Sequence, residues 1–252
     1  MNNTQSERSP YSIWSRRRML TTLGTGIAMT GFGPLILPGG ASPNAQIRHA
    51  VIGSGRQGRS HCKQFSGIGP DCRVVAICDV DPDQRRLALE VLPREFPVEE
   101  QEDYRRILDN PAIHTISIAT PDHWHTKIAV EAILAGKHVY VEKPCCHNIF
   151  EGNLLVRAAN KYGKCVQHGT QNRSSESVRN AIQFLRDGKL GKVRMAKAIN
   201  HQLREPIGRA PESDPPPGVN YDLWLGPAPK VAFTRNRWHY NWHWFWDYGT
   251  GD

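Results

Sequence analysis

Downstream of residue 46, two hydrophobic patterns alternate along the chain. Continuous apolar runs predict strands that are buried on both faces, at residues 47–52, 73–79, 113–120, 138–141 and 164–169. Amphipathic segments between these runs predict helices, at residues 59–65, 82–92, 104–108, 125–135 and 150–162. Strand and helix thus alternate in units of roughly 20–30 residues. We therefore expect an α/β fold with a parallel sheet covered by helices on both faces, at residues 46–167.

The pattern changes after residue 167. Residues 192–201 alternate like the first strand of a second sheet, and residues 206–218 are rich in Pro and Gly, which predicts a loop. Five of the seven Trp lie between Trp224 and Trp246. Aromatic side chains suit either stacking on sugar rings or packing against another part of the protein, and both interpretations stay open. We expect the beginning of a second, α+β domain at residues 168–252.

The first 45 residues resemble an export signal. Ser15, three arginines and Met19-Leu20 precede a weakly apolar run with several Gly and Thr, which ends near Leu37. This matches the twin-arginine pattern, and cleavage would follow Ala41 or Ala45. The alternatives are a basic tail or a membrane anchor, but so short and Gly-rich a run is a poor spanning helix. We expect a periplasmic or otherwise exported protein with no stable membrane span.

Charge and cysteine content narrow the function classes. The chain carries a formal charge of +8, of which residues 1–45 contribute +3, and no basic run occurs beyond residue 20. Nucleic-acid binding is therefore not expected, and a mildly basic pocket for an anionic cofactor suffices. The six Cys form no C-x-x-C pair and no zinc spacing, so we expect reduced thiols and no metal site.

A glycine motif follows the first predicted strand. It has the form G-x-G-x-x-G and comprises Gly53, Ser54, Gly55, Arg56, Gln57 and Gly58. In a dinucleotide site the first Gly turns the chain, the second lets the backbone approach a pyrophosphate, and the third lets the helix pack closely. The N–H groups at the helix start then face the phosphates. The alternative is an ordinary Gly-rich turn, and the motifs that follow it in the chain decide between the two.

An acid ends the second strand in the register that such a site needs. Asp79 lies 21 residues after Gly58, where a carboxylate accepts hydrogen bonds from the adenosine ribose. Asp81 and Asp83 follow closely and compete for this role. Because an acidic cluster repels a 2′-phosphate, NAD is favoured over NADP.

Two further strand ends carry polar residues. One comprises Thr120, Pro121, Asp122, His123, Trp124 and His125; the other is Glu142-Lys143-Pro144. Ligands bind at the carboxyl ends of parallel strands, so both segments are expected at the cofactor. Lys143 is the predicted catalytic residue, because a desolvated amine beside a nicotinamide can exchange a proton with a substrate hydroxyl. The alternative is a surface Lys paired with Glu142. For the two His, the alternatives are cofactor contact or packing at the helix start.

Taken together and in order, these motifs resemble the Gfo/Idh/MocA oxidoreductases, the glucose–fructose oxidoreductase and inositol dehydrogenase types. The resemblance covers residues 47–252 and implies a Rossmann-type domain, a catalytic role for Lys143 and cofactor contacts from Thr120, Pro121, His123, His125 and Glu142. It also implies substrate contacts from Gln171, Asn172 and Arg173, although Arg173 fits a surface position equally well. The family places a second catalytic His shortly after a segment like residues 246–252, so we expect a C-terminally truncated chain that is impaired in catalysis.

The sequence thus predicts an NAD(P)-dependent oxidoreductase that acts on the hydroxyl or carbonyl group of a sugar or polyol. Export implies a tightly held cofactor, because free NAD is scarce outside the cytoplasm. The resemblance implies a homo-oligomer when the chain is full length. One alternative is an NAD-dependent glycosidase of the same superfamily, and another is a non-catalytic dinucleotide-binding protein.

Overall fold

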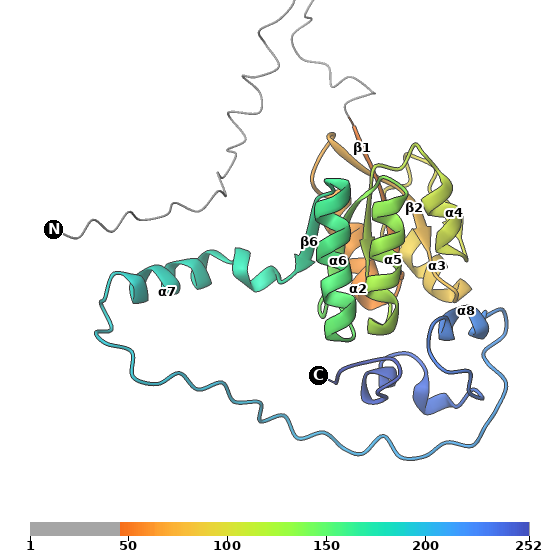
Figure 1. Cartoon of the computed structure of the whole chain (residues 1–252). Coiled ribbons are helices and arrows are strands. Elements are labelled where there is room, and N and C mark those ends of the chain that lie inside the picture. Colours follow the sequence, from red (N-terminus) through yellow and green to blue (C-terminus); the bar gives the residue numbers. More distant parts are fainter. Residues whose placement is uncertain (1–45, 252) are drawn as a thin grey trace, which may run out of the picture. The chain divides into compact units, whose positions relative to one another are not determined.

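A computed structural model describes residues 46–251 of the chain, and the predicted export signal at residues 1–45 lies outside them. Within the described part, parallel strands form one sheet in the order β3-β2-β1-β4-β5-β6. The strands are β1 (Ile47–Ile52), β2 (Cys72–Cys78), β3 (Glu99–Gln101), β4 (Thr115–Ile118), β5 (His138–Glu142) and β6 (Val166–Gly169). This is the doubly wound Rossmann order, with its switch point between β1 and β4. The predicted α/β fold is confirmed (Figure 1).

Helices connect these strands and flank the sheet (Figure 1). They are α2 (Arg56–Ser66), α3 (Pro82–Leu89), α4 (Tyr104–Asp109), α5 (Asp122–Leu134) and α6 (Ile149–Tyr162). Side-chain caps fix several starts: Asp81 accepts from the Asp83 amide, and Asn148 from the Glu151 amide. The helix α5 begins at Asp122, three residues before the predicted start at residue 125. Pro121 occupies the N-cap, and the Asp122 carboxylate accepts from the Thr250 amide.

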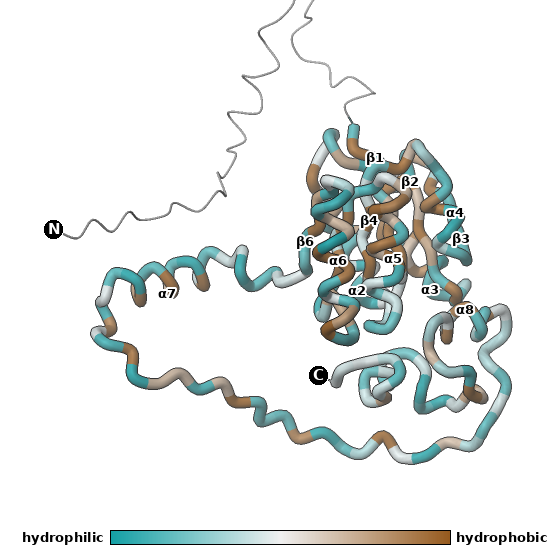
Figure 2. Tube along the Cα trace, in the orientation of Figure 1, coloured by the Kyte–Doolittle hydropathy of each residue, from teal (hydrophilic) through white to brown (hydrophobic). Residues whose placement is uncertain are grey.

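Apolar residues of the central strands pack on both faces of the sheet, as the continuous runs predict. In β1, Ala50 and Ile52 face one cluster, which includes Ile116 and Ile128. Val51 faces the opposite cluster with Cys62, Val74 and Ile77. Figure 2 shows these hydrophobic stretches along the strands. Burial of successive residues on opposite faces accounts for the absence of polar alternation in the central strands.

Beyond β6 the chain is mostly irregular. It contains η1 (Gln171–Ser174), α7 (Glu176–Arg186), α8 (Tyr221–Leu225), η2 (Arg235–Arg237) and η3 (Asn241–Trp244). The strand predicted at residues 192–201 was wrong, because that stretch pairs with no other described strand. Alternating side chains do not make a strand without a neighbour to accept its backbone hydrogen bonds.

An aromatic cluster joins the last described residues to the Rossmann sheet. Trp224, Leu225 and Tyr248 are buried together and pack against Val80, at the end of β2. The Trp124 indole donates to the Trp224 carbonyl at 2.9 Å, which ties α5 to α8. The packing interpretation therefore holds for Trp224, whereas Trp246 is 85% exposed.

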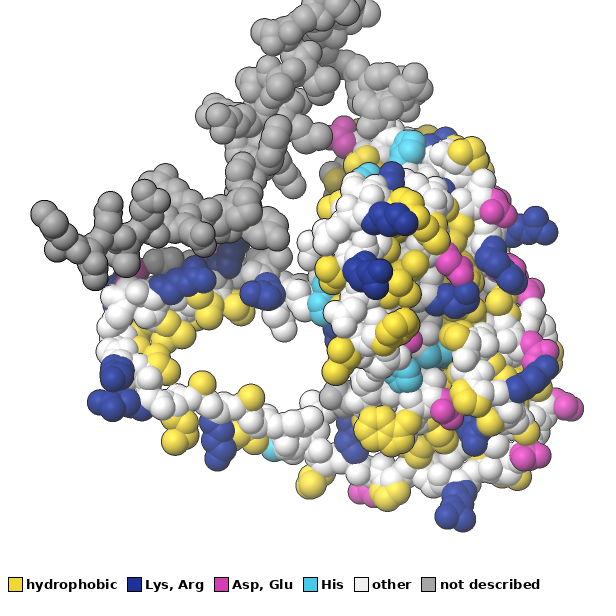
Figure 3. Space-filling view, viewed as in Figure 1, with side chains coloured by type: hydrophobic (Ala, Val, Ile, Leu, Met, Phe, Trp, Pro, Cys, Tyr) yellow, Lys and Arg dark blue, Asp and Glu magenta, His cyan; other side chains and the backbone are white. Residues whose placement is uncertain are grey.

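The described surface carries mixed charge. On the face that Figure 3 shows, Lys and Arg side chains are interspersed with Asp and Glu rather than gathered in one basic patch. None of the helices within residues 46–251 combines the length and the apolar character that crossing a membrane requires. Nor does this part of the chain bring three or more His, Cys, Asp or Glu side chains together where they could hold a metal ion.

Candidate active site

The glycine motif forms the turn from β1 into α2. Gly53 has φ +84°, and a Cβ on it would lie 2.6 Å from the Ala119 carbonyl carbon. A Cβ on Gly58 would lie 1.8 Å from the Gly53 carbonyl oxygen, so both positions require glycine for the fold itself. Gly55 differs, because a Cβ there would meet nothing within 4 Å. The open space over Gly55 leaves room for a ligand at the backbone.

The start of α2 is suited to an anion. Gly55 is the N-cap, and no side chain caps the first-turn N–H groups. These donors and the positive end of the helix dipole lie at the cavity that Gly55, Arg56 and Gln57 line. The Ser54 hydroxyl instead points inward and donates to the Cys78 carbonyl at 3.2 Å. Ser54 therefore braces the turn with its side chain.

Asp79 connects this turn to the end of β2. Its carboxylate accepts from the Ser54 amide at 2.6 Å and from the Asp81 amide at 3.0 Å, and the residue lines the cavity. Burial raises the pKa of the Asp79 carboxyl, against the two amide hydrogen bonds that lower it. Of the three acids in this segment, Asp81 caps α3 and accepts from His239, while Asp83 is exposed. Asp79 is thus the acid that faces the cavity.

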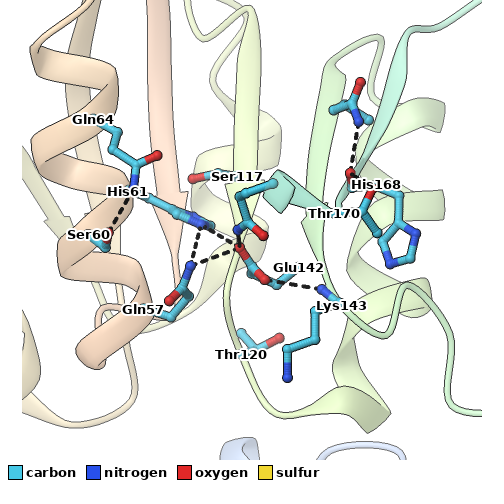
Figure 4. Close-up of polar contacts among 12 residues, drawn as sticks. Gln57, Ser60, His61, Gln64, Ser117, Thr120, Glu142, Lys143, His168 and Thr170 are labelled. Atoms are coloured by element: carbon cyan, nitrogen blue, oxygen red, sulfur yellow. Dashed lines mark hydrogen bonds and ion pairs between the residues drawn. The ribbon is translucent and has the colours of Figure 1, made fainter. Parts of the chain in front are cut away.

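Glu142, the last residue of β5, is the centre of a buried polar network (Figure 4). Its Oε1 atom accepts from Gln57 at 2.9 Å, His61 at 3.0 Å and Gln171 at 2.7 Å. Its Oε2 atom accepts from the Lys143 amide at 3.2 Å. Burial opposes ionisation, but these hydrogen bonds outweigh it and lower the pKa of Glu142. The carboxylate is therefore held charged and fixed beside the cavity.

Lys143 lies directly after this network, and its side chain points away from the Glu142 carboxylate, near Thr120 (Figure 4). It lines the cavity together with Thr120 and Pro121. Among the described residues it forms no ion pair with Glu142, so the surface-pair alternative is not what the geometry shows. The side chain is exposed, so the predicted desolvation of its amine is not supplied by the described residues. A bound ligand would have to supply it.

The two His of the α5 start have different positions. Both His123 ring nitrogens approach carbonyls of the C-terminal segment, those of Trp224 at 3.1 Å and Tyr248 at 3.4 Å. Burial lowers the pKa of His123 to about 4, and the residue does not line the cavity. It acts in packing, which was the alternative to cofactor contact. His125 does line the cavity, and its ring approaches the Thr120 and Pro144 carbonyls.

The predicted substrate residues lie in η1 and are not brought to the cavity as a group. Gln171 reaches Glu142 and so joins the polar network. Asn172 and Arg173 are exposed and do not line the cavity.

The cavity has a volume of about 660 Å³. The wall that faces the Rossmann strand ends was not predicted from the sequence. This wall comes from the C-terminal segment and comprises Trp224, Trp238, His239, Tyr240, Trp242 and His243. The His239 imidazole lies 2.8 Å from Asp81 and closes the end near Asp79. His243 lies at the other end, where burial and the nearby Lys143 ammonium lower its pKa. The Trp and His clustering was visible in the sequence, but its location required the fold.

A glycine turn, a β2-terminal acid and a helix start around one cavity define a dinucleotide-binding Rossmann protein. Family comparison agrees: residues 47–170 match the oxidoreductase family NAD-binding Rossmann fold of the Gfo/Idh/MocA group. Residues 207–252 match the C-terminal alpha/beta domain of the same oxidoreductase family. The chain belongs to the Gfo/Idh/MocA oxidoreductase family.

Named proteins and a solved structure are similar to parts of this chain. An inositol 2-dehydrogenase of Arthrobacter sp. (strain FB24) is 29% identical over 70% of this chain and 49% of the relative. A glycosyl hydrolase family 109 protein of Saccharopolyspora erythraea is 28% identical over 81% of this chain and 49% of that protein. The crystal structure of scyllo-inositol dehydrogenase from Lactobacillus casei, with bound NAD(H) and scyllo-inositol, is 27% identical and superposes with a TM-score of 0.53. That match covers 58% of this chain and 42% of the neighbour. The chain spans about half the length of the curated relatives it matches.

Proposed function

We propose that this chain carries the cofactor half of an NAD-dependent oxidoreductase that acts on a hydroxyl or carbonyl group of a sugar or polyol. The observation that carries the proposal is one cavity lined by the glycine turn, by Asp79 and by Lys143. Inositol and sugar-nucleotide dehydrogenases among the relatives and structural neighbours support the substrate class.

The residues present fit a dinucleotide. The open space over Gly55 and the uncapped α2 start suit a pyrophosphate, and Asp79 at the end of β2 suits ribose hydroxyls. The negative charge of Asp79 disfavours a 2′-phosphate at the same place, which supports NAD over NADP. Thr120, Pro121 and Lys143 then border the nicotinamide end.

When bound, NAD supplies the hydride acceptor or donor. The chain's own contribution is to orient the substrate and to move its hydroxyl proton. Lys143 Nζ takes that proton as the carbon–hydrogen bond breaks, or returns it when a carbonyl is reduced. At the Lys143 end, Trp242 lines the cavity beside His243 and offers an aromatic surface for a sugar ring. The bound sugar ring and cofactor exclude water from the Lys143 amine. They thereby supply the desolvation that the described residues do not provide.

The test combines binding with chemistry. Purified chain is titrated with NAD by fluorescence, and NADH formation is followed with myo-inositol and a panel of sugars. Lys143→Ala is expected to bind NAD as the wild-type chain does and to lose NADH formation by about 10²-fold or more. Lys143→Ala with undiminished turnover contradicts the catalytic role. Absence of NAD binding to the wild-type chain contradicts the whole proposal.

A second candidate function is an NAD-dependent glycosidase. The match to a glycosyl hydrolase family 109 protein extends over 81% of this chain, against 70% for the inositol 2-dehydrogenase. Release of a free sugar from a glycoside without net NADH formation favours this function. A dinucleotide sensor without catalysis is the remaining alternative, and for it Lys143→Ala leaves the biological function unchanged.

We further propose that residues 1–45 direct twin-arginine export, that the cofactor is loaded before export and held tightly, and that the full-length protein assembles as a homo-oligomer. The support is the Ser15–Leu20 pattern and the scarcity of free NAD in the periplasm. Cell fractionation of the wild-type chain and of an Arg16→Lys/Arg17→Lys variant tests the export step. Co-purification of NAD with the exported protein tests the retention step.

A further inference from the structure

The segment that carries Lys143 is held from one side by a single imidazole. His125 is 1% exposed; its Nδ1 atom lies 2.6 Å from the Pro144 carbonyl oxygen and its Nε2 atom lies 2.8 Å from the Thr120 carbonyl oxygen. Thr120 follows β4, and Pro144 follows Lys143. One buried ring therefore bridges the two strand ends that border the proposed nicotinamide site.

Neighbouring contacts reinforce the bridge. The next residue of α5, Thr126, donates from its hydroxyl to the Cys145 carbonyl at 3.1 Å. On the other side, the Lys143 amide donates to Glu142 at 3.2 Å. The backbone on both sides of Lys143 is thus fastened, while the lysine itself lines the cavity. A fixed backbone restricts the positions that the Lys143 amine can reach.

We propose that His125 is a positioning residue for Lys143, acting through the hydrogen bond from its Nδ1–H to the Pro144 carbonyl. The catalytic part of this inference rests on the proposed function. A neutral imidazole donates from one nitrogen, and we assign that proton to Nδ1, which faces the Pro144 carbonyl. The Thr120 carbonyl then sits against Nε2 and receives a hydrogen bond only when the ring is an imidazolium. The Pro144 bond is therefore the one that persists in both protonation states.

Opposing effects act on the pKa of the ring. Burial lowers the pKa of His125, whereas the Pro144 carbonyl, the Asp122 carboxylate, the Thr120 carbonyl and Glu142 act in the opposite direction. His123, Lys143 and His147 are among the further cationic or titratable residues on the same two segments. In either protonation state, a ring that carries its proton on Nδ1 keeps the bond to the Pro144 carbonyl.

Two substitutions separate the ring nitrogens. His125→Asn places an amide nitrogen near the Nδ1 position and retains the bond to Pro144. His125→Gln places it near the Nε2 position and retains only the contact with Thr120. Thr126→Val is the matched control, because it removes a neighbouring hydrogen bond of the same segment and keeps the side-chain shape.

The first measurement is amide hydrogen exchange of the peptide spanning residues 142–148, in the chain with and without NAD. We expect His125→Gln to exchange at least about tenfold faster than the wild-type chain, His125→Asn to stay close to it, and Thr126→Val to exchange more slowly than His125→Gln. Equal exchange in His125→Gln and His125→Asn overturns the proposal. The exchange measurement requires no turnover, so its result does not depend on whether the proposed oxidoreductase function is correct.

The second measurement is turnover, if the wild-type chain forms NADH. We expect His125→Gln to lower kcat by about 10- to 100-fold with the Kd for NAD unchanged, and His125→Asn to restore most of it. A fall in NAD affinity with unchanged kcat overturns positioning in favour of cofactor contact. If neither variant folds, ¹⁵N spectra of the wild-type imidazole decide. A His125 Nδ1 that carries no proton at neutral pH refutes the proposal.

Discussion

Gly58 and Gly55 of the β1–α2 turn have different roles. Substituting each by Ala therefore distinguishes an effect on stability from an effect on cofactor binding. In Gly58→Ala the new Cβ would lie 1.8 Å from the Gly53 carbonyl oxygen and 2.8 Å from the Gly53 carbonyl carbon. Both atoms are backbone and belong to a turn with little room to move, because a Cβ on Gly53 would itself lie 2.6 Å from the Ala119 carbonyl carbon. The clash can be relieved only by moving α2 away from β1.

The magnitude follows from two opposing effects. Ala is favoured over Gly inside a helix by about 1 kcal/mol. Overpacking against a rigid neighbour costs roughly 1–3 kcal/mol or more, and a backbone contact at this distance belongs at the upper end. We therefore expect Gly58→Ala to lower the free energy of unfolding by about 2 kcal/mol or more. In urea this corresponds to a fall of about 1 M in the midpoint, followed by tryptophan fluorescence.

Gly55→Ala is the matched control. Its Cβ would meet nothing within 4 Å, and its φ of −60° suits Ala, so the unfolding free energy is expected to fall by less than about 1 kcal/mol. The added methyl group occupies the space where the pyrophosphate is proposed to lie, so the Kd for NAD is expected to rise by at least about tenfold. An unchanged urea midpoint in Gly58→Ala contradicts the backbone clash, and wild-type NAD affinity in Gly55→Ala contradicts a pyrophosphate at this position.

Three further perturbations test the fold and the site. Burial lowers the pKa of His49 to about 3, so below about pH 6.5 the unfolded chain takes up a proton that the folded chain does not. The unfolding free energy therefore falls by about 2 kcal/mol between pH 7 and pH 5. His49→Gln is expected to flatten this decline in urea titrations. Asp79→Ser removes the charge expected to repel a 2′-phosphate, so the ratio of NADP to NAD affinity should rise by about tenfold, as fluorescence titration with each nucleotide would show. Asp122→Asn weakens the charge-assisted bonds from the Thr250 amide and hydroxyl, at 3.1 and 3.0 Å, so residues 245–251 should loosen by roughly 1–3 kcal/mol and be cleaved faster in limited proteolysis; unchanged cleavage would show that the aromatic cluster alone holds the segment.

Local sequence determined the elements and the cofactor turn. The spacing of the apolar residues indicates strand or helix, because a strand buried on both faces consists of a nearly continuous apolar run. The glycines encode the turn, because at Gly53 and Gly58 no other residue fits the backbone. The 21-residue interval to Asp79 then places an acid at the neighbouring strand end. These features depend on contacts within one βαβ unit, so they could be predicted from the chain alone.

The tertiary structure decided the partners and the opposite wall. Glu142 looked like a cofactor contact or the partner of Lys143, but Gln57, His61 and Gln171 hold its carboxylate. His123 fastens the C-terminal segment instead of lining the cavity, and His243 reaches the end where Lys143 lies. These contacts join residues that are tens to more than a hundred positions apart, and no local pattern encodes them. Sequence periodicity determines which side chains are buried or turned outward, whereas only the packing of distant segments decides which polar groups meet.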